Sequence, residues 1–258
     1  MNHTTTYSRA VVRRPGSSLV HGLTTAAFGP PDLERARRQH GGYIDALKNL
    51  GLTVSLLPPV ESLPDSVFVE DTAVAAGECV VLCAPGAPSR RGEVAAIESE
   101  LVPHFAESET IRPPATLEGG DVMLAGRKFF VGISARTNRA GFERFSDIVN
   151  RFGFTAEAVE LRQFLHLKTG VACIGEQTLV VAGELVDRDA WRGFEQIVVP
   201  EGEAYAANCI RINERVLVPE GFPRTCHAIE TAGFETEAVA VSEFRKLDGG
   251  LSCLSIRF

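Results

Sequence analysis

The sequence predicts an α/β fold in which hairpin-plus-helix units stand around a common axis. Pairs of apolar strands joined by short turns containing Gly or Asn occur four times along the chain. They recur at intervals of roughly 40 to 50 residues, the range in which repeated structural units are expected. Segments with helical periodicity separate them. Apolar residues make up 45% of the 258 positions, which is enough for a large core.

The N-terminal part of the chain predicts two strands with a helix between them. The strands are YSRAVVRRP at 7–15 and GLTVSLLP at 51–58. The helix is PDLERARRQHGGYIDALKNLG at 31–51, which has the clearest helical periodicity. It opens with Pro-Asp and closes on Gly51, in agreement with helix capping preferences.

The middle of the chain predicts four hairpins and three further helices. Each hairpin is a strand, a tight turn and a second strand. The hairpins and their turns are 72–85 with Gly77-Glu78, 121–132 with Gly126-Arg127, 171–183 with Gly175-Glu176, and 208–221 with Asn213-Glu214. The helices are 89–105, which ends near a proline, and 137–153 and 222–233, which both close on a glycine.

The last stretch, LSCLSIRF at 251–258, alternates as a strand does. A fifth unit closes the ring if this strand pairs with the N-terminal one, and closure leaves few edge strands. The alternative is an ordinary α+β sandwich with coincidental spacing. We expect one domain over residues 1–258, because no low-complexity segment or linker divides the chain.

Charge and hydropathy argue against several classes of partner. The net charge of −7 does not fit a nucleic-acid-binding protein, and the densest basic stretch, ERARRQH at 34–40, reads as a solvated helix face. No run approaches the roughly 18 apolar residues that span a bilayer. The polar N-terminus does not resemble a signal peptide. The six cysteines show no disulfide-framework pattern, so we expect reduced thiols and a cytoplasmic location.

Three stretches place acids or a histidine in apolar surroundings. They are PDSVFVEDTAV at 64–74, TLEGGDVML at 116–124 and FLHLKTG at 164–170. A carboxylate buried in strand-forming sequence needs a partner, either structural or a cationic ligand. Taken singly, Glu118 also reads as an acidic turn residue and His166 as a satisfied core histidine.

The adjacent acids of the first stretch, Glu70 and Asp71, pose a separate question. Neighbouring residues of a strand point to opposite faces, so at most one of them faces a given pocket. Both converge only where the chain leaves regular strand.

A fourth stretch, DGGLSC at 248–253, places Cys253 after a glycine pair. Such a hinge suits a nucleophile that must reach a pocket, although it does not prove one. Cys79 and Cys83 are a weak zinc signal without a matching ligand pair and read as core thiols. The remaining cysteines, Cys173, Cys209 and Cys226, read as packing residues.

Together a thiol, a histidine and several carboxylates supply a nucleophile, a proton shuttle and a holder for a cation. Carboxylates beside a catalytic cysteine would repel the oxyanion that forms from an amide. They suit a guanidinium electrophile, which stays protonated and matches the fork geometry of paired carboxylates.

The motifs of the chain resemble those of the dimethylarginine dimethylaminohydrolases, guanidino-modifying enzymes of the pentein superfamily, and particularly the short bacterial members. The resemblance runs from GLT at 22–24 to the last residue, with the motifs in the same order. They are PDSVFVEDTAV, SRRGE (89–93), TLEGGDVML, SARTN (134–138), LHLKTG, AYAANCI (204–210), PRT (223–225) and RKLDGGLSCLSIRF. It implies a five-fold pseudo-symmetric α/β propeller around a central pocket, which agrees with the repeated hairpins.

The resemblance also implies roles for individual residues. It places the nucleophile at Cys253, the catalytic histidine at His166 and the third catalytic residue at Glu118. It assigns the remaining positions to substrate binding: Asp71 with Glu118 for the guanidinium, Glu70 near the substrate and the histidine, Arg90 and Arg136 for the carboxylate, Asp65 and the carbonyls of Leu23 and Leu247 for the amino group, and Phe68 as an aromatic wall.

The implied reaction is hydrolysis of Nω,Nω-dimethyl-L-arginine, and of the monomethyl compound, to L-citrulline and the free amine through a covalent S-alkylthiouronium intermediate. It needs no cofactor and no metal, and the expected partner is the small-molecule substrate, with no nucleic acid and no membrane. The alternatives are an arginine deiminase or amidinotransferase on the same scaffold, a non-catalytic pentein that binds a partner, and a metal hydrolase. The sequence leaves open whether the protein is a monomer or a homodimer.

Overall fold

The computed structural model describes residues 6–258 and arranges them as five three-stranded sheets. Each sheet combines an antiparallel pair with one parallel strand. In chain order the sheets are β1 (Arg9–Arg13) with β2 (Thr53–Leu57) and β15 (Ile256–Arg257); β3 (Ala73–Ala76), β4 (Cys79–Leu82) and β5 (Glu107–Thr110); β6 (Val122–Ala125), β7 (Lys128–Ile133) and β8 (Thr155–Glu160); β9 (Val171–Cys173), β10 (Thr178–Val181) and β11 (Glu195–Val198); and β12 (Ile210–Ile212), β13 (Arg215–Pro219) and β14 (Glu235–Val239). The fold is the five-fold α/β propeller that the sequence predicts.

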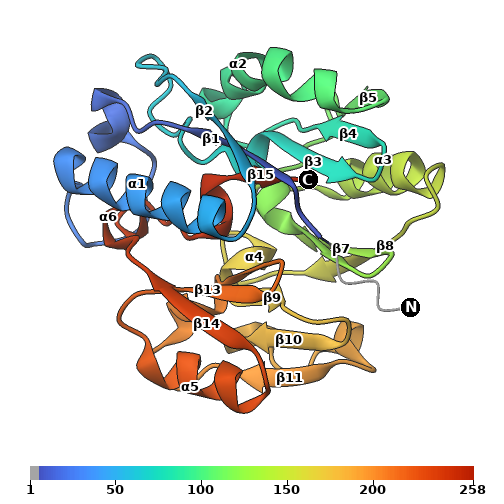
Figure 1. Cartoon of the computed structure of the whole chain (residues 1–258). Helices are drawn as coiled ribbons and strands as arrows, with labels where there is room; N and C mark the ends of the chain where they lie inside the picture. The colour runs from blue at the N-terminus through green and yellow to red at the C-terminus, as the bar shows by residue number, and fades with distance from the viewer. Residues whose placement is uncertain (1–5) are drawn as a thin grey trace.

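Helices connect the two parallel strands in four of these units and lie on the outside of the ring (Figure 1). They are α1 (Leu33–Asn49), α2 (Gly92–Leu101), α3 (Arg139–Asn150) and α5 (Pro223–Thr231). Asp32 caps α1 and Asn138 caps α3, each accepting a backbone N–H of the first turn. In the fourth sheet, short 3₁₀ turns replace the helix. Two single-turn helices, α4 (Leu167–Gly170) and α6 (Ser242–Arg245), complete the set within residues 6–258.

Ring closure, which the sequence left as one of two options, is confirmed by strand pairing. In the closing sheet Ala10 pairs with Arg257 and Val11 with Ile256, so the two ends of the described chain share one sheet. The buried apolar residues form five clusters, and each cluster fills the space between two neighbouring sheets. Because the fifth cluster joins the closing sheet to the sheet of β3 and β4, the core runs right round the ring.

The four predicted turns all lie between paired strands, and the predicted helices lie within the expected ranges. The structure differs from the sequence prediction in two respects. The third strand of each later sheet, for example ESET at 107–110, was not predicted, because its polar composition carries no apolar alternation. The final strand is shorter than 251–258: it covers Ile256–Arg257 alone, and Cys253 lies on a 3₁₀ turn, Ser252–Leu254.

Among residues 6–258, no helix combines the length and the apolar character needed to cross a membrane.

Candidate active site

A narrow cavity of about 30 Å³ brings together nine of the eleven site residues that the sequence predicts. They are Leu23, Asp65, Phe68, Asp71, Arg90, Arg136, His166, Leu247 and Cys253, and three residues that were not predicted, Leu165, Asp248 and Gly249, complete the lining. The two predicted residues outside the lining are Glu70 and Glu118. The cavity therefore joins segments that lie more than two hundred positions apart in the chain.

Four of the predicted site residues occupy similar places in their units, just before the first strand of each unit; the closing unit begins with β15 and continues with β1 and β2. Asp71 precedes β3, Glu118 precedes β6, His166 precedes β9 and Cys253 precedes β15. Because the sheets surround one axis, residues at the entrance to each first strand converge. The repeated architecture thus explains how the sequence gathers a site from four separate motifs.

His166 is held by two carboxylates. Its Nε2 atom lies 2.6 Å from Oε2 of Glu118 and 4.0 Å from Oδ1 of Asp71. Burial alone would lower the pKa of the imidazole, but the negative charge of Asp71 and the hydrogen bond that the imidazolium donates to Glu118 outweigh it and raise the pKa to about 9. His166 is therefore a cation at neutral pH and can donate a proton.

Glu118 serves the histidine and does not reach the cavity surface. Its side chain is fully buried, and its Oε1 atom accepts hydrogen bonds from the backbone N–H groups of Gly86 and Ala87 and lies 3.4 Å from Nη1 of Arg136. Burial favours the neutral acid, but the bond to His166 outweighs it and holds the pKa below its usual value. Of the two roles implied for Glu118, the structure displays the contact with the histidine.

Asp71 faces the cavity and is fixed by its neighbours. Its Oδ1 accepts the N–H of Gly120 at 2.9 Å, and its Oδ2 accepts Nη1 of Arg90 at 2.6 Å. Burial would raise the pKa of this acid, yet His166 and Arg90 lower it to about 2. A Cβ at Gly120 would lie within 3 Å of both Asp71 and the imidazole, so the glycine lets these two side chains approach. Asp71 is a permanent anion in the cavity.

Two arginines, Arg90 and Arg136, are predicted to bind the substrate carboxylate. They differ in how many of their N–H groups already bond to other residues of the protein. Arg90 is buried and bonds to Glu93 through Nε and Nη2, to Asp71 through Nη1, and to the carbonyl of Phe68. Arg136 is more exposed, and its ion pair among the described residues is the 3.4 Å contact with Glu118. Glu93 was not predicted as part of the site, although its place three residues after Arg90 in SRRGE is a readable pairing signal.

Asp65 also lines the cavity, and it accepts the backbone N–H of Leu23 through Oδ1. Burial raises the pKa of Asp65 despite the positive charges of the two arginines. The unpredicted Asp248 fixes the same region, because its Oδ2 accepts both the N–H and the hydroxyl of Thr25. The first contact ties the 22–25 segment to Asp65, and the second ties it to the turn that precedes Cys253.

Cys253 is a buried thiol at the cavity wall. Burial, followed by the negative charges of Asp71 and Glu70, raises its pKa to about 12, while the backbone N–H of Gly250 and the hydroxyl of Ser252 oppose the rise. The neighbouring acids contribute to this rise, but the larger cause is burial.

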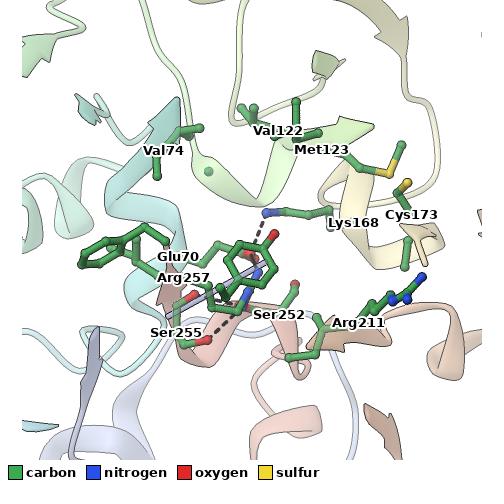
Figure 2. A pocket seen from close by; sticks show the side chains of 18 of the residues that line it. Glu70, Val74, Val122, Met123, Lys168, Cys173, Arg211, Ser252, Ser255 and Arg257 are labelled. Carbon is green, nitrogen blue, oxygen red and sulfur yellow. Dashed lines mark hydrogen bonds and ion pairs between the residues drawn. The ribbon is translucent and has the colours of Figure 1, made fainter. Parts of the chain in front are cut away.

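Glu70 points away from this cavity and into a second one. The chain forms a 3₁₀ turn at Val69–Thr72, so the two adjacent acids take different directions. Glu70 Oε1 lies 2.6 Å from Nζ of Lys168 and 2.8 Å from Nη2 of Arg257. Figure 2 shows this ion-pair cluster at the edge of the second cavity, which has a volume of about 300 Å³ and apolar walls that include Val74, Val122 and Met123.

One group of side chains has the composition of a metal site. Ligand atoms of Asp71, Glu118 and His166 all lie within 4.8 Å of one another, which sequence spacing alone did not reveal. In the structure these atoms bond to each other, to Arg90 and to backbone N–H groups. A metal ion at this position would have to replace those bonds.

Comparison with known proteins reveals extensive similarity. The family model described as N,N dimethylarginine dimethylhydrolase, eukaryotic, matches residues 32–215. A dimethylarginine dimethylaminohydrolase of Pseudomonas aeruginosa is 44% identical over 98% of this chain and 100% of its own length. A solved structure of the Pseudomonas aeruginosa enzyme, a cysteine-to-serine variant in complex with citrulline, superposes with a TM-score of 0.97 at 43% identity and covers 98% of this chain and 100% of that one. A dimethylarginine dimethylaminohydrolase structure with histidine replaced by glycine, an adduct with S-methyl-L-thiocitrulline, superposes with a TM-score of 0.96 at 43% identity and the same coverage.

Proposed function

The chain belongs to the dimethylarginine dimethylaminohydrolase family, and from this membership we propose that it hydrolyses Nω,Nω-dimethyl-L-arginine and Nω-methyl-L-arginine to L-citrulline and the free amine. The observation that carries the proposal is that Cys253, His166 and Asp71 border one cavity while Glu118 bonds to the imidazole. The citrulline complex and the thiocitrulline adduct of similar proteins support the same chemistry.

Substrate recognition rests on acidic and basic side chains that line the same cavity. Asp71 accepts hydrogen bonds from the guanidinium, because it is an anion that faces the cavity. Arg136 grips the substrate carboxylate, since few of its N–H groups are engaged within the described residues. Arg90 acts mainly by holding Asp71, and its second Nη1 proton remains for the substrate.

The amino group of the substrate binds on the side of Asp65. The Oδ2 atom of this acid and the carbonyls of Leu23 and Leu247 supply the acceptors, and Phe68 forms the aromatic wall. The cavity of about 30 Å³ is far smaller than the roughly 300–1,000 Å³ of typical ligand pockets, so we expect it to widen when an amino acid enters. The site draws on residues from Leu23 to Cys253, which supports one catalytic domain.

Catalysis begins with attack of the Cys253 thiolate on the central guanidinium carbon. The S–C bond forms, the C–N bond to dimethylamine breaks, and the imidazolium of His166 gives its proton to the departing nitrogen. The neutral imidazole then removes a proton from water, which adds to the same carbon. Collapse of that adduct breaks the S–C bond and returns the thiolate, while the hydroxyl proton leaves through solvent to the released amine and the C=O of the ureido group of citrulline forms.

The protonation states favour this order. His166 holds its proton at neutral pH because its pKa is about 9, so the acid is ready before the amine departs. The thiol is protonated in the free protein because its pKa is about 12. Arrival of the substrate cation next to Asp71 offsets the negative charge that disfavours the thiolate, and the nucleophile forms with the substrate in place.

Product analysis tests the function directly. The purified protein is incubated with dimethylarginine, monomethylarginine or arginine, and citrulline and the released amine are quantified, with the Cys253→Ser variant as the blank. We expect citrulline from the two methylated compounds and far less from arginine. Faster turnover of arginine would replace the proposed substrate with that of a deiminase, and absence of citrulline from all three would refute the function.

A further inference from the structure

The repeated architecture contains a fifth position that the reaction has not yet used. Asp71, Glu118, His166 and Cys253 each stand just before the first strand of a unit, and the remaining unit has Asn208 in that place, two residues before β12. Asn208 is buried, with a fractional exposure of 5%, and does not line the catalytic cavity. An amide has no charge and no proton to transfer, so any role must come from its hydrogen bonds.

Those bonds join the turn that carries the nucleophile to the turn that carries the histidine. Oδ1 of Asn208 accepts the backbone N–H of Ser252 at 3.0 Å. Nδ2 donates to Oγ of Ser252 at 3.1 Å and to the carbonyl of Lys168 at 2.9 Å. Ser252 precedes Cys253, and Lys168 lies in the single helical turn that follows His166. One side chain therefore fixes both catalytic segments relative to each other.

The same bonds determine where the Ser252 hydroxyl sends its proton. Both Nδ2 protons of Asn208 go to oxygen atoms, so Ser252 Oγ is an acceptor in that contact and its own proton is free. The thiol sulfur of Cys253 lies 3.9 Å from Oγ, within reach of a hydrogen bond to sulfur. Because Ser252 Oγ accepts a hydrogen bond from Asn208, its own hydroxyl proton can be donated to the Cys253 sulfur. Such a hydrogen bond stabilises the thiolate form.

The glycine at position 250 is needed for the contact between Asn208 and Ser252. A Cβ at this position would lie 2.5 Å from Oδ1 and Cγ of Asn208, so a larger residue would push the amide away from Ser252. The backbone here does not require a left-handed conformation, because Gly250 has no positive φ. Close approach of Asn208 is the reason for glycine.

We propose that Asn208 is a positioning residue that acts through Ser252: it aims the serine hydroxyl at the Cys253 sulfur and locks the nucleophile turn onto the histidine turn. The proposal rests on the role of Cys253 as the nucleophile in the proposed function. It adds two residues, Asn208 and Ser252, to the groups that determine how readily that thiolate forms.

The test measures the thiol itself and does not need turnover. Cys253 is alkylated with iodoacetamide over a range of alkaline pH, and its modification is quantified by peptide mass spectrometry, which separates it from the other cysteines. Removal of one hydrogen bond to a charged group corresponds to about a tenfold change, so Ser252→Ala and Asn208→Ala should each lower the alkylation rate about tenfold at a given pH below the midpoint. Ser252→Thr keeps the hydroxyl and should restore the rate.

A double-mutant cycle isolates the relay. If Asn208 acts through Ser252, the double variant should react no more slowly than Ser252→Ala alone. Asn213→Ala is the matched control: Asn213 also makes three hydrogen bonds, to Tyr7 and Leu50, but does not line the catalytic cavity. It should lower the melting temperature and leave the alkylation profile of Cys253 unchanged.

Two results would overturn the proposal. If the alkylation profile of Ser252→Ala coincides with that of the wild-type protein, Ser252 does not stabilise the thiolate. If the effects of the two substitutions are additive, Asn208 does not act through Ser252. Ser252→Ala keeps the backbone N–H that Asn208 accepts, so it decides the first point even if Asn208→Ala fails to fold. Because alkylation is independent of substrate, a wrong substrate assignment would appear in product analysis and not here.

Discussion

Replacement of Glu118 by glutamine removes the charge that bonds to His166 while it keeps the size of the side chain. In the native protein the pKa of His166 is about 9, against an ordinary value of 6.5. A hydrogen bond to a charged group contributes about 1.5–3 kcal/mol, which corresponds to one to two pKa units. Asp71 remains 4.0 Å from Nε2 and still favours the cation. We therefore expect the pKa of His166 in Glu118→Gln to fall to roughly 7–8.

NMR titration of the imidazole resonances measures this shift. His40 provides an internal reference, since burial, reinforced by the positive charge of Arg14, lowers its pKa to about 4. Glu243→Gln is the matched control, because Glu243 is a buried, hydrogen-bonded acid that does not line the catalytic cavity. An unchanged or higher pKa of His166 in Glu118→Gln would refute the reasoning, and an equal fall in Glu243→Gln would show that the effect is not local.

The same shift carries a prediction for stability. Because the folded-state pKa of His166 is raised, protonation stabilises the native state fully below the unfolded-state value of about 6.5, and this stability is lost as the pH rises through about 9. The difference of about 2.5 units corresponds to about 3 kcal/mol in the free energy of unfolding. Urea unfolding at a series of pH values should show this loss in the native protein and a smaller one in Glu118→Gln. A flat profile for the native protein would contradict it.

Three further substitutions separate the remaining roles. Cys253→Ser should abolish turnover but retain binding of citrulline, measured by calorimetry; full activity would exclude Cys253 as the nucleophile. Arg136→Ala should raise KM about 10- to 100-fold with little change in melting temperature, because its ion pair with Glu118 is long and a charged hydrogen bond to the substrate is lost; an unchanged KM would contradict its assignment. Arg90→Ala should destabilise the protein by about 3–5 kcal/mol in denaturant titration, because it leaves the buried acids Asp71 and Glu93 without their partner; a loss below 1 kcal/mol would show that the pair is not structural.

The helices and hairpin turns could be predicted from the sequence because they carry local signals. Gly77 and Gly126 adopt positive φ at two of the turns, and Asn213 does so at a third. The parallel strand of the first unit, β2, was predicted, but those of the four later units could not be, because segments such as ETEAV at 235–239 depend on pairing with a neighbour already in place.

Site residues could be predicted where they lie in a recognisable motif. The direction in which a side chain points could not be predicted. Adjacent Glu70 and Asp71 could not be assigned to different cavities, since the 3₁₀ turn that separates them has no signature in the sequence. Lys168 and Asn208 were missed because each acts through a contact with a distant segment. The glycine pair before Cys253 was interpreted as a flexible hinge. The structure instead requires it for close packing, with Gly249 against Phe68 and Gly250 against Asn208.

The pairing of β1 with β15 also governs when the molecule becomes complete during synthesis. Ser8 and Phe258 are in contact although 250 positions separate them, so every other unit must leave the ribosome before the final sheet can form. The sulfur of Cys253 belongs to the same late segment. A nascent chain thus carries Asp71, Glu118 and His166 before Cys253 has been made, and the last sheet and the cavity are completed together.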